Sequence, residues 1–190
     1  MVYVFLANGF EETEALVTVD VLRRAGYEVL TVGVGGEFVE GTHGITVKAD
    51  TTEAMVSPDE RLSAVILPGG MPGTLNLKAS EKVSEFIRYA ADKKKVIGAI
   101  CAAPSVIGEM GLLRGRVATC YPGFESSLIG ATVEKSPCVV SDNFVTAAGA
   151  GAVFEFSFAL TDLLAWQEGK TAYGDFSLSE GIEESMQCAR

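Results

Sequence analysis

Six consecutive apolar residues, residues 2–7, follow Met1, and this run constrains the fold more than any other feature. A strand with no polar face must be covered on both sides, as the strands of parallel sheets are. Residues 12–24 follow with apolar side chains at helical spacing, acidic residues at the start and arginines at the end, which suits the helix dipole. Gly26 is placed to end that helix, and residues 27–34 form a second strand pattern. The start of the chain therefore predicts a βαβ unit.

The same alternation continues along the chain. Strand patterns occupy residues 63–68, 96–100, 116–120 and 144–147, and helical patterns occupy residues 80–95, 102–113 and 153–166. Residues 37–51 are rich in glycine and β-branched side chains and predict a hairpin or edge excursion. The C-terminal segment predicts a short helix or a loosely packed tail. Strands that alternate with helices predict an α/β fold with a doubly wound sheet and helices on both faces.

The composition narrows the class of protein. A chain of 190 residues with a hydrophobic fraction of 48% can bury a full core, and we expect one domain over residues 1–190. The net charge of -10 repels phosphate backbones and anionic lipids, which argues against nucleic acid and membrane surfaces as partners. No apolar run approaches the ~20 residues that cross a bilayer. Small molecules or proteins are the expected partners.

The cysteines and the N-terminal residues bear on location and metal binding. The first apolar run has no basic residues before it, so a secretory signal is not expected. The four cysteines show no CxxC spacing and have no histidine companions, which argues against a zinc site and against a small disulfide scaffold. A reducing cytoplasm is the expected location, and we expect no metal.

Three loops that follow predicted strands contain residues that could take part in catalysis or binding: residues 8–14, 69–73 and 101–104. In open α/β sheets, ligands bind beyond the carboxyl ends of the strands, where such loops gather. We therefore expect a thiol, several carboxyl groups and a glycine-lined backbone to lie within reach of one another.

Cys101 stands between a predicted strand and a predicted helix, with small residues on both sides. Small neighbours suit a sharp turn that keeps a nucleophile accessible, and a helix N-terminus would favour the thiolate. The alternative is that Cys101 is a small buried apolar residue, as most free cysteines are.

Carboxyl and backbone groups could complete a site around this thiol. Three acidic residues, Glu11, Glu12 and Glu14, lie in the first turn of a predicted helix, where they would at least support the helix dipole. A carboxyl beside a thiol holds a proton more tightly and can move it, and Glu14 is our preferred partner for Cys101. The N–H groups of Gly69, Gly70 and Ala102 could form an oxyanion hole, although a turn after a strand favours glycine anyway.

The chain has one histidine, His43, in the predicted hairpin, and nothing in the sequence places it near Cys101 in the same subunit. A surface or packing role is its simplest interpretation, though a dimer could bring it close. Tyr121 follows another predicted strand and could line the same pocket.

Four motifs occur in order along nearly the whole chain: residues 7–14 (ANGFEETE), 20–26 (DVLRRAG), 67–70 (LPGG) and 99–104 (AICAAP). With these motifs the chain resembles the ThiJ/PfpI superfamily and looks closest to its Parkinson-disease deglycase branch. The resemblance implies a flavodoxin-like three-layer sandwich with a mostly parallel doubly wound sheet, and a homodimer. It also implies Cys101 as nucleophile, Glu14 as its acid, and the N–H groups of Gly70 and Ala102 as the oxyanion hole.

The activities implied by the resemblance are glyoxalase and deglycase chemistry on small reactive aldehydes such as methylglyoxal, without a cofactor. The Cys101 thiolate would attack the aldehyde to give a hemithioacetal, and Glu14 would move a proton between adjacent carbons before a 2-hydroxy acid leaves. A redox sensor that oxidises Cys101 to a sulfinic acid and a chaperone-like stress protein are the alternatives.

Two departures from the superfamily pattern bear on activity. Its peptidase members carry histidine directly after the cysteine, where this chain has Ala102, and this argues against a peptidase. Its deglycase-like members often carry histidine before a proline at the position of Tyr121, so we expect glyoxalase turnover to be slow or altered.

Overall fold

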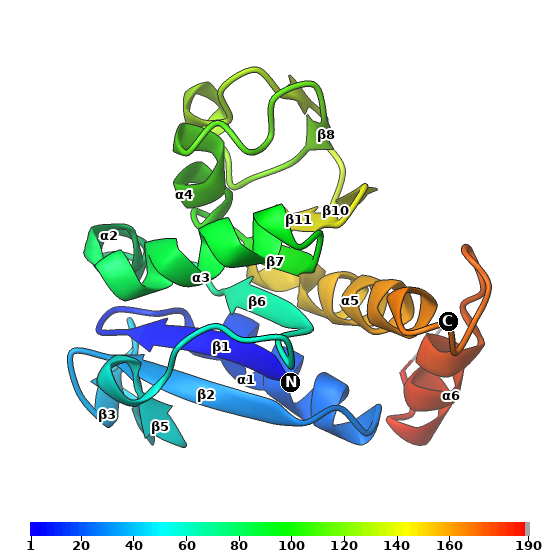
Figure 1. Cartoon of the computed structure of the whole chain (residues 1–190), viewed down its shortest axis with the longest axis horizontal. Helices are drawn as coiled ribbons and strands as arrows, with labels where there is room; N and C mark the ends of the chain where they lie inside the picture. Colours follow the sequence, from blue (N-terminus) through cyan, green and yellow to red (C-terminus); the bar gives the residue numbers. More distant parts are fainter. Residues whose placement is uncertain (189–190) are drawn as a thin grey trace.

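A computed structural model describes residues 1–188 and shows a central seven-stranded sheet in the order β10-β11-β7-β6-β1-β2-β5 (Figure 1). Its strands are β1 (Val2–Ala7), β2 (Val29–Val34), β5 (Thr51–Thr52), β6 (Ala64–Leu67), β7 (Val96–Ile100), β10 (Cys138–Ser141) and β11 (Phe144–Ala147). All neighbouring strands run parallel except β10 and β11. The predicted mostly parallel, doubly wound sheet is confirmed.

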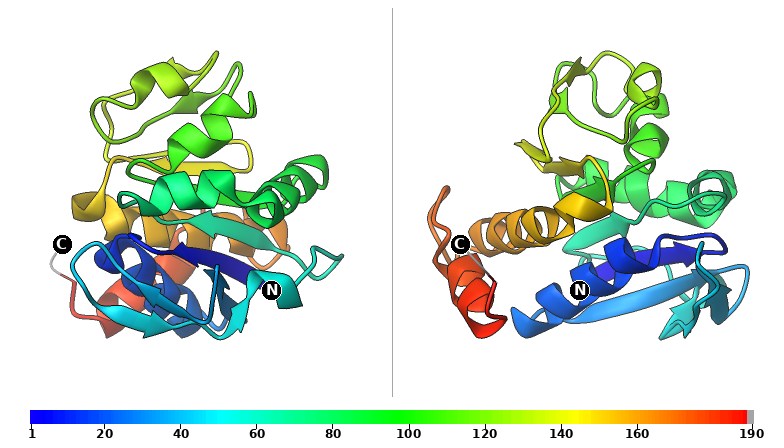
Figure 2. Two further views of the ribbon diagram at one scale, coloured as in Figure 1. Left: turned by 90° about the vertical axis from the view of Figure 1, so that its left-hand side faces the viewer. Right: turned by 180° about the vertical axis from the view of Figure 1, so that it is seen from behind.

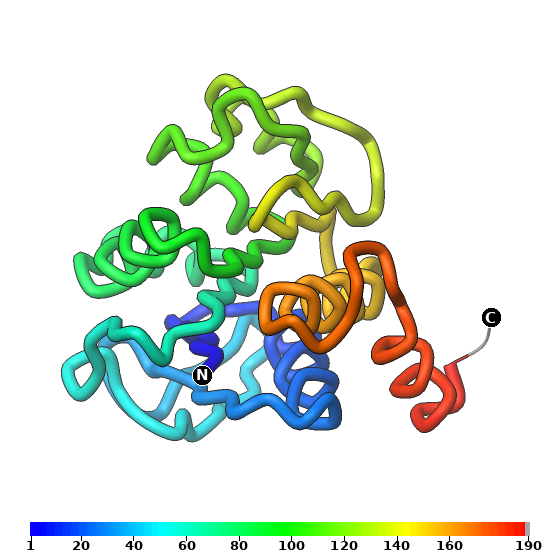
Figure 3. Tube along the Cα trace, turned by 45° about the vertical axis from the view of Figure 1, so that its right-hand side comes forward, coloured from blue at the N-terminus to red at the C-terminus, as the bar shows by residue number. Residues whose placement is uncertain are grey.

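Helices cover both faces of this sheet and complete the three layers. Helices α1 (Glu12–Arg24) and α5 (Val153–Gln167) lie on one face and come to the front when the molecule is seen from behind (Figure 2). Helices α2 (Gly73–Ala79), α3 (Glu81–Asp92) and α4 (Pro104–Glu109) lie on the other face. Helix α6 (Ser177–Ser185) packs against α5 at the side of the molecule (Figure 3). The α/β class and the flavodoxin-like sandwich are therefore confirmed.

The apolar run of β1 is explained by its position in the middle of the sheet. Val2, Val4 and Leu6 point into the core under α1 and α5, whereas Tyr3 and Phe5 point into the core under α3. The rings of Tyr3 and Phe5 lie 4.9 and 5.0 Å from that of Phe86 on α3. Because each face of the strand meets a different core, every position of β1 must be apolar.

The remaining elements lie outside the main sheet. The predicted hairpin is present as antiparallel strands β3 (Phe38–Glu40) and β4 (Thr46–Lys48). Strands β8 (Val117–Ala118) and β9 (Thr132–Val133) form a small separate sheet in a segment that projects from the rest of the molecule (Figure 1). Short 3-10 turns occupy Glu53–Met55, Glu125–Ser127 and Ala150–Ala152. None of the described helices is long and apolar enough to cross a membrane.

Several predicted element bounds are wrong, for local reasons. The strand predicted over residues 116–120 is only two residues long, because Thr119 N–H donates to the Thr146 hydroxyl at 3.0 Å instead of to a strand. The helix predicted to reach residue 113 ends at Glu109, and Gly111 then takes a positive φ of 76°. Helix α2 was not predicted, because it begins at Gly73 within a glycine- and proline-rich loop and has no side-chain cap.

Candidate active site

The candidate site lies where three adjacent strands, β1, β6 and β7, end. The loops that follow these strands are joined by backbone hydrogen bonds, from Glu11 N–H to the Gly69 carbonyl at 3.0 Å and from Gly73 N–H to the Gly9 carbonyl at 3.1 Å. A Cβ atom built on Gly69 would lie 2.6 Å from the Cys101 Cβ atom, so the third loop meets the other two, as expected from the sequence.

Cys101 follows β7 directly and adopts a left-handed backbone conformation, with a φ of 64°. This conformation costs a non-glycine residue roughly 1–2 kcal/mol, so the surroundings must hold it in place. The Cys101 N–H donates to the Ala147 carbonyl at 2.8 Å, and the Cys101 carbonyl accepts from Tyr121 N–H at 2.8 Å. The backbone is thus fixed on both sides at a sharp turn that leaves the side chain only partly buried.

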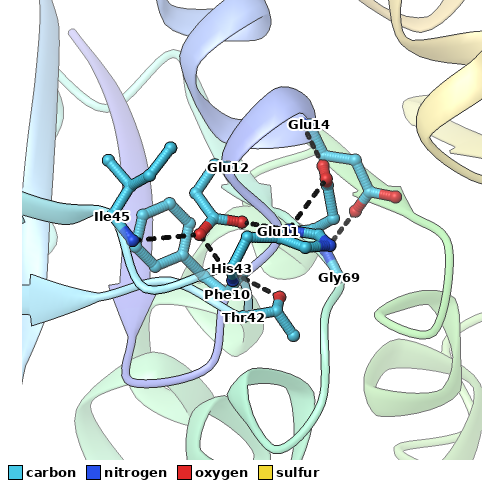
Figure 4. Close-up of polar contacts among 8 residues, drawn as sticks. All are labelled: Phe10, Glu11, Glu12, Glu14, Thr42, His43, Ile45 and Gly69. Atoms are coloured by element: carbon cyan, nitrogen blue, oxygen red, sulfur yellow. Dashed lines mark hydrogen bonds and ion pairs between the residues drawn. The ribbon is translucent and has the colours of Figure 1, made fainter.

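Glu14 comes to this thiol from the first turn of α1, and its side chain is 1% exposed. The carboxylate oxygen Oε2 accepts a hydrogen bond from Gly69 N–H at 2.7 Å (Figure 4). The other oxygen, Oε1, is buried and accepts no hydrogen bond from the nitrogen and hydroxyl groups that the structure describes. The Cys101 thiol is the polar group that remains beside the carboxyl.

Gly69 separates the thiol from the carboxyl and leaves no room for a side chain. A Cβ atom built on Gly69 would lie 2.6 Å from the Cys101 Cβ atom and 2.8 Å from Glu14 Oε2, both too close for atoms in contact. The absence of a side chain at position 69 therefore lets the cysteine and the glutamate approach each other.

The Gly69→Ala variant is expected to lose at least about tenfold of any activity that depends on the Cys101–Glu14 pair, because the new methyl group would push the two side chains apart. The Gly36→Ala variant is the matched control, since a Cβ atom at Gly36 meets nothing within 4 Å. Activity and thermal unfolding of both variants check this prediction, and an unchanged activity in Gly69→Ala would contradict it.

Burial has the largest effect on the pKa values of Glu14 and Cys101. It raises the pKa of Glu14 from 4.5 to about 7, and the nearby charge of Glu11 acts in the same direction. Burial, followed by the negative charge of Glu14, raises the pKa of Cys101 to about 12. Because each group disfavours the negative charge of the other, the two titrate as a pair that keeps one proton between these values.

The expectation that a helix N-terminus lowers the pKa of Cys101 is wrong. Helix α4 has six residues and begins at Pro104, so Cys101 lies before its first turn. The backbone N–H groups of Ala102 and Gly70 do act to lower the pKa of the thiol, but burial and Glu14 outweigh them. A thiolate at Cys101 therefore requires the shared proton to lie on Glu14.

Gly70 and Ala102, the predicted oxyanion-hole residues, both present their N–H groups to the Cys101 sulfur. Gly70 has a φ of 89°, and a Cβ atom there would lie 2.4 Å from the Gly9 carbonyl oxygen. Only glycine fits this close contact between two loops. The Ala102 carbonyl is held by the Ser105 hydroxyl, which donates to it at 2.6 Å.

Tyr121 lies next to the sharp turn at Cys101, the strand-to-helix elbow, since its N–H donates to the Cys101 carbonyl. Its side chain is 50% exposed and packs beside Gly149, where a Cβ atom would lie 3.3 Å from the ring. This places Tyr121 beside the turn at Cys101, and its role in lining a substrate pocket stays a prediction.

His43 contacts Glu12 rather than Cys101. Glu12 is 4% exposed, and its two oxygens accept from the His43 backbone N–H at 2.7 Å and contact the His43 Nδ1 atom at 2.8 Å (Figure 4). The hydrogen bond to Glu12 raises the pKa of His43. Glu12 thus fastens the turn between β3 and β4 to α1, a structural role that the sequence analysis missed. A glycine at position 41, where a Cβ atom would lie 2.3 Å from Glu12, is the signal that could have indicated it.

Glu11, Glu12 and His43 place ligand atoms within 4.8 Å of one another, a spacing that could hold a metal ion. Each carboxyl already has a structural partner, however. Glu11 Oε2 accepts from Glu14 N–H at 2.6 Å and caps α1, and Glu12 holds the hairpin turn. These contacts account for the cluster without a metal.

The fold and the cysteine–glutamate pair define a class of α/β proteins with a thiol at a strand-to-helix elbow. The chain belongs to the DJ-1/PfpI family, whose profile matches residues 1–163. It is 35% identical over 168 residues to Protein dj-1beta of Drosophila melanogaster, covering 87% of this chain and 89% of that protein. It is 34% identical over 162 residues to a deglycase of Pyrococcus horikoshii, covering 84% and 90%. An oxidized DJ-1 structure from Toxoplasma gondii superposes with a TM-score of 0.88 at 30% identity, covering 100% of this chain and 98% of that one.

These comparisons confirm the resemblance to the ThiJ/PfpI superfamily and support a general deglycase or DJ-1 function.

Proposed function

We propose that the protein is a cysteine-dependent enzyme that converts small reactive aldehydes such as methylglyoxal, and their adducts, without glutathione or another cofactor. The observation that carries this proposal is the buried Cys101–Glu14 pair, which shares one proton beside the N–H groups of Gly70 and Ala102. Relatives that are named deglycases support an enzymatic role.

In the proposed reaction, the Cys101 thiolate attacks the aldehyde carbon and forms a carbon–sulfur bond. The aldehyde oxygen becomes negatively charged, accepts hydrogen bonds from the N–H groups of Gly70 and Ala102, and then takes the shared proton from Glu14 to give a hemithioacetal. Glu14 removes the proton from the hemithioacetal carbon and returns it to the neighbouring former ketone carbon. The product is a thioester, which water cleaves to release lactate and the free thiol. The sum is methylglyoxal plus water to lactate and a proton, so no oxidant or cofactor is consumed.

The pH dependence of this reaction follows from the pair. Below about pH 7 both Glu14 and Cys101 carry a proton and no thiolate forms, whereas above it the pair holds one proton. We expect kcat/KM for methylglyoxal to rise with pH through about 7 and then level. Initial rates between about pH 5 and 9 check this, and a profile without a limb near neutrality would contradict the assignment of Glu14.

Glutathione-free conversion of methylglyoxal by purified protein tests the proposal. Loss of methylglyoxal should be matched by lactate, quantified by NMR, with Cys101→Ser assayed beside the wild type. If no lactate forms, or if the variant retains the activity, the proposed function is wrong.

A redox-sensing function is the second candidate, because the oxidized Toxoplasma gondii DJ-1 superposes on this chain. In this case peroxide would convert Cys101 to a sulfinic acid, and a protonated Glu14 would donate a hydrogen bond to it. Mass spectrometry after mild peroxide should find Cys101 oxidised ahead of Cys120, Cys138 and Cys188. Another order of oxidation would rule out this function.

We also propose a homodimer, which would determine whether His43 reaches a neighbouring subunit's site. Within the described chain His43 contacts Glu12 and Glu11 and is largely exposed. Sedimentation equilibrium measures the oligomeric state, and a monomer would leave His43 without a role at Cys101.

A further inference from the structure

The largest cavity described, about 840 Å³, lies at the opposite end of the sheet from Cys101. It opens where β7 and β11 begin, between the C-terminal ends of α3 and α5, and is lined by residues such as Lys94 and Asn143. The five residues of β7 separate it from Cys101 by about 17 Å. Its volume is typical of pockets that hold small molecules. The cavity is therefore distinct from the candidate active site.

The cavity concentrates positive charge in an acidic protein. Lys94, Arg114 and Arg116 line it with a single acidic residue, Asp142, although the whole chain carries a net charge of -10. Arg116 is held in place, because its Nε atom lies 3.1 Å from Asp142 Oδ2 and its guanidinium lies 4.8 Å from the centre of the Phe144 ring. Among the described residues, Lys94 and Arg114 form no ion pair. These two cations remain available for an anion.

Lys94 occupies a position where glycine would be less strained. Its φ is 52°, and it lies just after α3, where the N–H groups of Lys94 and Lys95 bond to the carbonyls of Ala91 and Ala90 at 3.2 and 2.8 Å. Helices commonly end in such a left-handed residue, which is usually glycine. The Gln167 side-chain amide also donates to the Lys94 carbonyl at 3.1 Å. These contacts hold the backbone of Lys94 at the cavity in its strained conformation.

Aromatic side chains form the other part of the lining. Trp166 and Tyr173 pack edge to face with ring centroids 5.0 Å apart, and they are 41% and 70% exposed. Exposed aromatic rings provide surfaces on which a planar ring can stack. The cavity therefore offers cationic donors and a stacking surface to the same occupant.

We propose that this cavity binds a small molecule that joins a planar ring to a phosphate group, of which a nucleoside monophosphate is an example. Lys94 and Arg114 bind the phosphate, because a doubly charged oxyanion best matches two cationic donors. The ring stacks against Trp166 and Tyr173. Arg116 offsets the charge of Asp142, so the charges of Lys94 and Arg114 leave the cavity positive.

The test uses the only tryptophan of the chain, Trp166, as a reporter. Adenosine 5′-monophosphate is titrated into the protein, and we expect a saturable change in tryptophan fluorescence. Adenosine alone and inorganic phosphate alone should each bind at least about tenfold more weakly, because each makes only part of the contacts. The absence of a saturable change, or equal binding of phosphate alone, would overturn the proposal.

Charge-matched variants locate the site. Lys94→Gly and Arg114→Gln should each weaken binding at least about tenfold. Lys93→Gln removes the same charge one residue away, and Lys93 does not line the cavity, so it should bind as the wild type does. Lys94→Gly is expected to fold normally because glycine relieves the strained backbone, and Arg114 is exposed. Wild-type affinity in both cavity variants, or an equal loss in Lys93→Gln, would overturn the proposal.

Discussion

Replacing Cys101 with serine is expected to reduce glutathione-free consumption of methylglyoxal by about 10³-fold or more. A serine hydroxyl is far less acidic than a thiol, so Glu14 could not take its proton to form an alkoxide. The substitution removes the nucleophile while retaining nearly the same shape at the elbow. The measurement is the rate of lactate formation at saturating methylglyoxal.

Cys188→Ser is the matched control for this variant, because Cys188 is also a partly buried free cysteine. It should keep wild-type activity, since Cys188 packs near α6 rather than near β7. Circular dichroism should show that both variants unfold at temperatures near that of the wild type. Equal activities in Cys101→Ser and wild type would mean that the chemistry lies elsewhere.

Replacing Glu14 with glutamine is expected to lower the same activity by about 10² to 10⁴-fold, the usual contribution of a positioned proton-transfer group. Glutamine can still accept the hydrogen bond from Gly69 N–H through its carbonyl oxygen, but it cannot carry the proton between carbons. In this variant, activity should no longer rise with pH through about 7, because the group that titrates there has been removed.

The Glu14→Gln variant should be more stable than the wild type above about pH 7. The pKa of Glu14 is about 7 in the folded protein against 4.5 as its ordinary value, so the folded state binds the proton more tightly. The free energy of unfolding therefore falls as the pH rises from 4.5 to about 7, and the deficit persists above that range. Glu14→Gln removes a deficit on the order of 3 kcal/mol. Urea unfolding at pH 5 and pH 8 measures it, and Glu60→Gln, which removes an exposed carboxyl and keeps the buried acid, is the comparison.

An unchanged stability at both pH values would show that Glu14 is charged without penalty. A loss of activity without a gain of stability would then show that Glu14 acts in the reaction without a raised pKa.

The central part of the fold could be predicted because its residues leave few choices. The apolar run of β1 allows only a strand buried on both faces, and the order of strands and helices requires a parallel sheet. The convergence of the loops at Glu14, Gly69 and Cys101 follows from that topology. These residues could therefore be grouped before the structure was known.

Other features depend on contacts that the sequence does not display. The short β8 arises because Thr119 bonds to a threonine side chain of β11, and α2 begins without a capping side chain. The protonation of Cys101 depends on how deeply the thiol is buried and on the Glu14 charge, both of which are tertiary properties. The attachment of Glu12 to the hairpin turn is likewise a tertiary contact, and Gly41 is its one indication in the sequence.

The position of Tyr121 separates the reactivity of the thiol from the choice of substrate, so that evolution could adjust each independently. The thiol and its acid are built on the central strands, whereas Tyr121 belongs to the projecting segment with β8 and β9 and reaches Cys101 through one backbone hydrogen bond. Under the proposed function, insertions or exchanges in the outer part of that segment would alter the surroundings of Tyr121 and with them the choice of substrate. The reactivity of the cysteine would be inherited unchanged, so one chemical centre could then serve aldehydes of different size.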